Sequence, residues 1–180
     1  RVVDTAESKD NINKAYNLIS TSKVRNEMII DDVITCVARK QTPVILTRFK
    51  EHAKFLHDAL KEKADHVFLL YGDNSDKENA EIRVKLKQIP ENESLILVAT
   101  GQKIGEGFDF PRLDVLMLAA PVSFEGRLEQ YVGRLNRDYV GKEAVYVYDY
   151  IDSHVRYFDK MYAKRLRTYR KMGFSIWTQE

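Results

Sequence analysis

Three polar side chains in the last third of the chain are spaced to form an anion-binding site. Gln130, Arg134 and Arg137 stand at positions i, i+4 and i+7, which fall on one face of a helix. Two guanidinium groups directed at one point, with no carboxylate on that face, favour a phosphate ligand, in particular a triphosphate. The competing interpretation is a solvated basic helix face. Gly133 argues against it, because a glycine inside a helix costs roughly 1 kcal/mol relative to alanine and a face in contact with solvent alone has no need of one.

A loop rich in glycine, residues 99–111, forms a second candidate site. It holds three glycines within seven residues, which allow backbone turns with positive φ and let a phosphate approach the main chain closely. Thr100 supplies a hydroxyl and Lys103 a positive charge, while Asp109 supplies a carboxylate that can accept a hydrogen bond from a ribose hydroxyl. From this segment alone, a flexible connection whose glycines only turn corners is an equally good interpretation.

Two common nucleotide-binding motifs are absent from the sequence. The phosphate-binding pattern G-x-x-x-x-G-K-[ST] occurs nowhere in the chain, and G-x-G-x-x-G does not follow the first predicted strand. Gly105 and Gly107 match the first half of the second pattern, but Pro111 stands close to where its last glycine is needed. The sequence therefore argues against a dinucleotide site. It also shows no lysine loop that would cradle phosphate and no acidic motif that would bind Mg²⁺.

The apolar pattern predicts the framework that must position these residues. Short, nearly continuous apolar runs alternate with segments of helical periodicity, which is typical of parallel strands buried on both faces and covered by helices. The sequence thus predicts an α/β fold, a doubly wound parallel sheet sandwiched between helices in three layers. Strands are expected at 44–47, 67–71, 95–99, 115–118 and 144–150, and helices at 31–40, 51–64, 76–89, 126–136 and 155–172.

The chain divides into three predicted parts. Residues 1–30 are polar and weakly patterned, so we expect an arm or linker with a short helix. Residues 31–152 hold the predicted sheet, and residues 153–180 form a basic amphipathic helix packed on it. Seven basic residues and one acidic residue lie between positions 156 and 171, and the outer face of this helix is either solvated or a contact for nucleic acid that ignores base sequence. Residue 1 is not methionine, which favours a piece of a longer protein.

Composition excludes several classes of protein. The 180 residues include 29 Lys and Arg against 27 Asp and Glu, so the net charge is only +2 and any nucleic acid must be held by a local patch. The single cysteine, Cys36, excludes an internal disulfide and a cysteine-based zinc cluster, and it fits a reducing compartment such as the cytoplasm. The four histidines have no metal-ligand spacing, so no metal site is expected. No apolar run approaches the roughly 18 residues of a membrane span.

The two candidate sites together resemble a known family. Ala99–Pro111 followed by Gln130–Arg137 resembles motifs V and VI of superfamily 2 helicases, and Thr47–His52 resembles their motif IV. The order, the spacing and the positions after strands are those of the second, C-terminal RecA-like domain of that superfamily. The resemblance extends from residue 30 to residue 152 and leans towards DEAD/DEAH-box and type III restriction-like DNA helicases.

The resemblance implies a nucleotide role for five residues of these motifs. Arg134 and Arg137 would be arginine fingers that reach the γ-phosphate of an ATP molecule bound mainly by a partner domain. Gln130 would lie near the same phosphates. Gly107 and Asp109 would line the nucleotide, with Asp109 at the ribose.

The resemblance also implies a strand of nucleic acid, more specifically DNA, as a second ligand. Thr100, Lys103 and Arg48 would contact its phosphate backbone. The Mg²⁺ of the ATP would be held by an N-terminal RecA-like domain of the same polypeptide, so the chain by itself is expected not to hydrolyse ATP. Two alternatives stay open: a binding module derived from a motor, which holds nucleic acid or protein without hydrolysis, and an enzyme that clamps a phosphorylated small molecule with Arg134 and Arg137.

Overall fold

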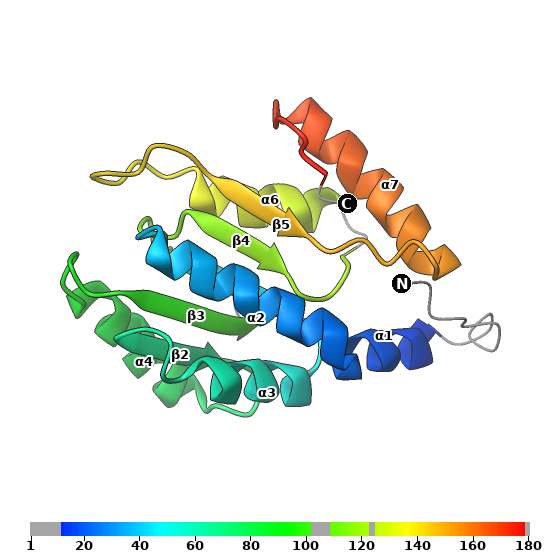
Figure 1. The fold of residues 1–180 in the computed structure, drawn as a ribbon. Coiled ribbons are helices and arrows are strands. Elements are labelled where there is room, and N and C mark those ends of the chain that lie inside the picture. The colour runs from blue at the N-terminus through cyan, green and yellow to red at the C-terminus, as the bar shows by residue number, and fades with distance from the viewer. Residues whose placement is uncertain (1–11, 102–108, 123–124, 179–180) are drawn as a thin grey trace.

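The computed structural model describes residues 12–101, 109–122 and 125–178, which contain one parallel sheet of five strands in the order β2-β3-β1-β4-β5 (Figure 1). The predicted doubly wound α/β fold is confirmed, and the strands end within two residues of their predicted positions. Their bounds are Pro43–Thr47 (β1), His66–Leu70 (β2), Leu95–Thr100 (β3), Val115–Leu118 (β4) and Tyr146–Asp149 (β5).

Helices cover both faces of the sheet. Buried side chains of α2 and α3 pack on one face, and those of α4, α6 and α7 pack on the other (Figure 1). Among the described residues, no helix has the length and apolar character to cross a membrane. The helices are α1 (Ile12–Thr21), α2 (Lys23–Ala38), α3 (Lys50–Leu60), α4 (Asp76–Gln88), α6 (Glu125–Leu135) and α7 (Arg156–Lys171).

The second helix begins earlier than its sequence pattern indicated. The expected start was Asp31, but α2 begins at Lys23, directly after Ser22. The Ser22 hydroxyl accepts a hydrogen bond from the backbone N–H of Arg25 (3.4 Å), so Ser22, which lies in the weakly patterned polar segment, is the N-cap of the helix. Helix α2 therefore runs through residue 30, the expected end of the arm, and the three-part division of the chain stays a prediction.

The central strands β1, β3 and β4 are buried along their whole length, which explains their continuous apolar sequence. Alternate side chains point to opposite faces, so Ile45 and Met117 join the core under α2 and α3, whereas Leu46 and Leu116 join the core under α4 and α6. Both helical layers are thus held to the sheet by apolar burial, the largest favourable contribution to folding.

Two buried arginine–carboxylate pairs attach helices at the carboxyl end of β5. In the first, Arg165 of α7 donates two hydrogen bonds to Asp149 (2.7 and 2.8 Å) and a third to the carbonyl of Val122 (3.0 Å). In the second, Arg25 of α2 donates two hydrogen bonds to Asp152, both 3.0 Å long. The guanidinium plane matches a carboxylate bidentately, so each pair fixes the orientation of its helix as well as its position.

Helix α1 is anchored at the carboxyl edge of the sheet through Tyr16. The Tyr16 hydroxyl donates a hydrogen bond to the carbonyl of Pro121 (2.8 Å), just beyond β4. Its ring packs edge-on against Phe158 of α7 (4.8 Å between centroids) and against Phe49 (6.2 Å), which precedes α3. The segment expected to be an arm with a short helix therefore contains a helix that joins the loop after β1 to the start of α7.

A buried histidine connects β1, α2 and α3. His52 lies between the hydroxyl of Thr47 (2.7 Å from Nδ1) and the side-chain oxygen of Asn26 (2.8 Å from Nε2). Because an amide oxygen can only accept, Nε2 carries the proton and Nδ1 accepts from Thr47. Burial, with the positive charge of Arg25 nearby, lowers the pKa of His52 from 6.5 to about 4.

Removing the guanidinium of Arg165, which pairs with Asp149 at the end of β5, should destabilise the fold strongly. We expect Arg165→Met to lower the free energy of unfolding by about 3–5 kcal/mol, because Asp149 is left as a buried charge without its counterion. The exposed α2 pair of Lys23 and Glu27 (3.7 Å) is the matched control, and Lys23→Ala should cost less than about 1 kcal/mol. Urea denaturation measures both, and equal losses would contradict the structural role of Arg165.

The buried histidine should make stability depend on pH. The unfolded chain binds a proton at His52 near its ordinary pKa of 6.5, whereas the folded chain does so only near pH 4, so stability is lost as the pH falls through this window. We expect wild type to lose about 3 kcal/mol more than His52→Gln between about pH 7 and pH 4. Denaturation at a series of pH values measures the difference, and parallel curves would show that His52 does not titrate in this way.

Candidate functional site

The ends of β1 and β3 lie side by side at the carboxyl edge of the sheet. Thr47 and Thr100 are partners in the parallel register, so the residues resembling motifs IV and V start from neighbouring positions. Thr100 is 8% exposed at the end of β3. The predicted strand contact Lys103 and the predicted nucleotide contact Gly107 lie outside the described residues.

The start of the glycine-rich loop is tied to helix α6. The hydroxyl of Tyr131 donates a hydrogen bond to the carbonyl of Gly101 (2.9 Å). A Cβ atom added at Gly101 would lie 2.8 Å from this hydroxyl oxygen, which is closer than side chains normally approach. Glycine at 101 therefore allows a close contact, and this contact joins the end of β3 to α6.

Helix α6 presents a mixed polar face beside that loop. Its apolar side chains Leu128, Val132 and Leu135 recur at helical spacing and are buried against the sheet. Gln130 is exposed and Arg134 is half-buried. A Cβ added at Gly133 would meet no atom of the described residues within 4 Å, so no contact that the structure describes accounts for this glycine.

The spacing predicted one helical face for Gln130, Arg134 and Arg137. Arg137 does not lie on that face. Helix α6 ends at Leu135, and Arg137 lies in the turn that follows. A carboxylate also stands beside it, since Arg137 Nε is 3.9 Å from Oδ1 of Asp109, and both side chains are about 60% exposed. An exposed pair of this kind contributes at most about 1 kcal/mol, so the two groups can separate to meet a ligand. The structure thus brings a residue of motif V to a residue of motif VI.

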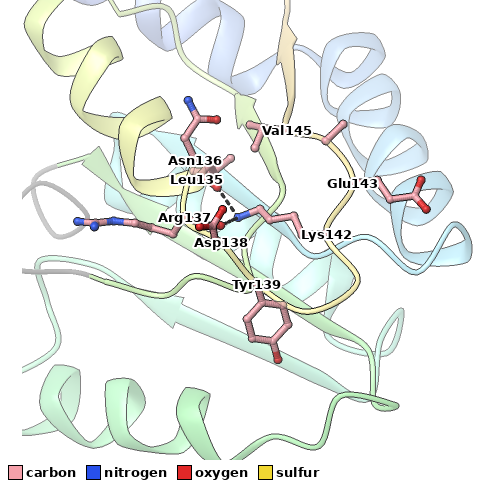
Figure 2. A pocket seen from close by; sticks show the side chains of 9 residues that line it. Leu135, Asn136, Arg137, Asp138, Tyr139, Lys142, Glu143 and Val145 are labelled. Atoms are coloured by element: carbon pink, nitrogen blue, oxygen red, sulfur yellow. Dashed lines mark hydrogen bonds between the residues drawn. The ribbon is translucent and has the colours of Figure 1, made fainter.

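Lys142 holds the turn that carries Arg137, and sequence reasoning missed it. Its ammonium group donates hydrogen bonds to the carbonyls of Arg137 (2.9 Å) and Leu135 (Figure 2). It donates a third to the carbonyl of Pro111 (2.8 Å). These carbonyls belong to the turn, the glycine-rich loop and the last turn of α6. Burial lowers the pKa of Lys142 below its ordinary value. The available signal was a lysine shortly after a predicted helix end, where cations are favoured by the unpaired carbonyls.

Arg48 is held at the same edge by an aromatic ring. Its guanidinium carbon lies 4.5 Å from the centre of the Tyr16 ring, which is a cation–π contact. The side chain remains exposed beside the end of β1, where it can also meet an anion. Among the residues that the structure describes, no group of three or more His, Cys, Asp and Glu side chains is arranged to bind a metal ion.

The described site residues form two groups. Arg48 and Thr100 follow or end adjacent strands at the carboxyl edge of the sheet. Asp109, Arg134 and Arg137 lie on the segment that leads into β4 and at the end of α6, which runs from the end of β4 back towards the start of β5 (Figure 1). The arrangement offers several positive charges, a hydroxyl and a carboxylate. Its chemistry suits a ligand with phosphate groups and a ribose.

Comparison with known proteins identifies the family. The family model for the helicase conserved C-terminal domain matches residues 25–138. The transcript termination protein A18 of Yaba-like disease virus is 32% identical over 120 residues, which are 66% of this chain and 24% of the viral protein. The chain thus spans about a quarter of the length of this relative.

Solved structures agree with this family in fold. T4 UvsW superposes with a TM-score of 0.74 at 22% identity, over 93% of this chain and 36% of that one. Domain 2 of the DEAD-box helicase Mss116p, solved bound to an RNA duplex, gives a TM-score of 0.54 at 21% identity, over 74% of this chain and 49% of that one. At these identities the likeness shows the fold alone. The family match covers more than half of the chain, so the chain belongs to the helicase conserved C-terminal domain family, and its fold is RecA-like.

Proposed function

We propose that this chain is the C-terminal motor domain of an ATP-dependent helicase or translocase that acts on nucleic acid, specifically DNA, in the cytoplasm. An N-terminal RecA-like domain of the same polypeptide would supply the phosphate loop and hold Mg²⁺, so this chain alone would not hydrolyse ATP. The observation that carries the proposal is the approach of Arg137 to Asp109 (3.9 Å), because it brings a residue of motif V and a residue of motif VI together on an exposed surface that a second domain can cover.

In this proposal two guanidinium groups stabilise the transition state of ATP hydrolysis. Arg134 and Arg137 stabilise the negative charge that grows on the transferring phosphoryl group, with Gln130 near the same phosphates. Fixed positive groups of this kind accelerate phosphoryl transfer by about 10³–10⁵. Gly107 and Asp109 line the nucleotide, and the exposed Asp109 carboxylate accepts from the ribose when Arg137 leaves it for the phosphate. The open space over Gly133 is where we expect the partner domain to approach.

The strand of nucleic acid would lie along the carboxyl edge of the sheet. Thr100 and Lys103 contact its phosphates from the end of β3 and the loop that follows. Arg48 contacts them from the end of β1, with its guanidinium oriented by the ring of Tyr16. The strand and the nucleotide would then touch the same loop, residues 99–111, so a change at one ligand could reach the other.

The finger assignment predicts a loss of catalysis without a loss of ATP binding. In the full-length protein, Arg134→Ala and Arg137→Ala should each lower the nucleic-acid-stimulated rate of ATP hydrolysis by about 10³–10⁵. ATP affinity should change little, because the charge that these groups stabilise develops only in the transition state. Steady-state turnover and equilibrium binding of a fluorescent ATP analogue measure the two quantities.

Arg39 provides the matched control for these variants. It is exposed at the end of α2, on the opposite face of the sheet from α6, so Arg39→Ala should leave turnover unchanged. Near-normal turnover in both Arg134→Ala and Arg137→Ala would reject the finger assignment. Absence of nucleic-acid-stimulated turnover in the full-length wild type would instead favour a domain that binds nucleic acid or protein without coupling to hydrolysis.

Lys142 should act on turnover through the position of Arg137. Without the ammonium group the three carbonyls lose their common donor, and displacement of a reacting group by about 1 Å can cost 10²-fold in rate. We expect Lys142→Met in the full-length protein to lower kcat by about 10–100-fold with little change in KM for ATP, and Lys142→Arg to restore part of the rate. A merely structural lysine would instead lower the melting temperature and leave kcat of the folded fraction unchanged.

A further inference from the structure

Positive charge is concentrated on one element of this nearly neutral chain. Helix α7 contains seven basic residues and a single acidic residue, Asp159. The chain as a whole has 29 basic and 27 acidic residues, so 22 basic and 26 acidic residues lie outside α7 and the remainder carries a net charge of −4. If a polyanion binds this domain through a broad electropositive surface, α7 is where that surface lies.

The basic side chains of α7 lie on the face directed away from the protein. Phe158, Thr168 and Tyr169 are buried on the inner face, together with Arg165, whose charge is neutralised by Asp149. Lys171 is exposed but pairs with Glu129 of α6 (3.2 Å). The other basic residues are exposed at helical spacing along about 22 Å of helix: they are Arg156, Lys160, Lys164, Arg167 and Arg170. We call these five residues the α7 stripe.

The α7 stripe begins beside the strand contact assigned to Arg48. Arg48 lies over the ring of Tyr16 (4.5 Å), and the Tyr16 ring packs against Phe158 in the first turn of α7 (4.8 Å between centroids). Phe158 stands between Arg156 and Lys160 in sequence. The stripe then extends along α7 away from the carboxyl edge of the sheet (Figure 1).

We propose that the α7 stripe is a second contact for single-stranded nucleic acid, which binds the phosphate backbone where the strand passes beyond Arg48. The proposal takes nucleic acid as the ligand from the proposed function and adds a surface outside the motifs. Lysine and arginine side chains that face outward bind phosphates without reading bases, so the contact is independent of sequence and sensitive to salt. A membrane surface is a poorer occupant, because an interfacial helix buries its apolar face in lipid and that face of α7 is already packed on the protein.

Charge reversal on the α7 stripe tests this contact in the full-length protein. We compare the triple variant Arg156→Glu, Lys160→Glu and Lys164→Glu with a control triple that has the same change in net charge. The control is Lys61→Glu, Lys85→Glu and Lys87→Glu, exposed residues at the ends of α3 and α4 on the opposite edge of the sheet. The probe is a fluorescent single-stranded oligonucleotide, offered as DNA and as RNA over a range of salt concentrations.

The slope of log affinity against log salt counts the phosphate contacts. Each contact on a single strand adds about 0.7 to the magnitude of the slope. The α7 triple should therefore reduce this magnitude by about 2, and it should weaken binding at low salt by tenfold or more. The control triple should keep the wild-type slope. Adding Arg48→Ala to the α7 triple should lower the slope further by about 0.7, since the two sites contact different phosphates.

Several results would overturn the proposal. They are an α7 triple with the wild-type slope, two triples with equally reduced slopes, and a wild-type protein that binds neither oligonucleotide. If the glutamate variant does not fold, the glutamine variant of the same three residues tests the same prediction. ATP turnover without nucleic acid should be unchanged by the α7 triple, so loss of the α7 contact is distinguishable from failure of the Arg134 and Arg137 assignment.

Discussion

A parallel sheet buried on both faces determines where this chain can present polar groups. Such a sheet needs a crossover helix between successive parallel strands, and the crossovers place every strand end of one polarity at a single edge. Side chains along β1, β3 and β4 are buried in the two cores, so residues that bind ligands must stand at the strand ends or on the loops and helices that connect the strands. Thr47 and Thr100 become neighbours for this reason although 52 positions separate them in the sequence.

A small number of polar contacts then hold the site residues and their loops in position. Tyr131 joins α6 to the end of β3, and Lys142 joins the end of α6 to the glycine-rich loop. Tyr16 holds Arg48 through a cation–π contact, and the Tyr16 hydroxyl is itself fixed by its hydrogen bond to the carbonyl of Pro121. None of these residues is itself assigned to a ligand. Lys142 and Tyr16 each hold a residue that is, Arg137 and Arg48, and Tyr131 holds Gly101 next to Thr100. These contacts position a site whose exposed groups contribute little stabilising energy of their own.

The sequence predicted the strands, whose positions follow from local pattern and burial. It did not predict the position of Arg137, which depends on tertiary contacts. Apolar runs located all five strands of the described sheet, most closely β1, β3 and β4, which are buried along their whole length. The prediction that Arg137 lies on the helical face of Gln130 and Arg134 was wrong, because α6 ends two residues earlier, where the ammonium of Lys142 binds the carbonyl of Leu135. No spacing rule could have found the ring beneath Arg48, since Tyr16 is distant from it in sequence. The glycine at 133 was noticed, and the structure leaves it without an internal explanation.

The most direct test is to measure how tightly the full-length protein binds ADP with Mg²⁺ and aluminium fluoride, which imitates the transferring phosphoryl group. If Arg134 acts on the transition state, Arg134→Ala should weaken binding of this analogue by about 10²-fold or more while ATP affinity stays within about threefold. Equal effects on both ligands, or no effect on either, would contradict the account.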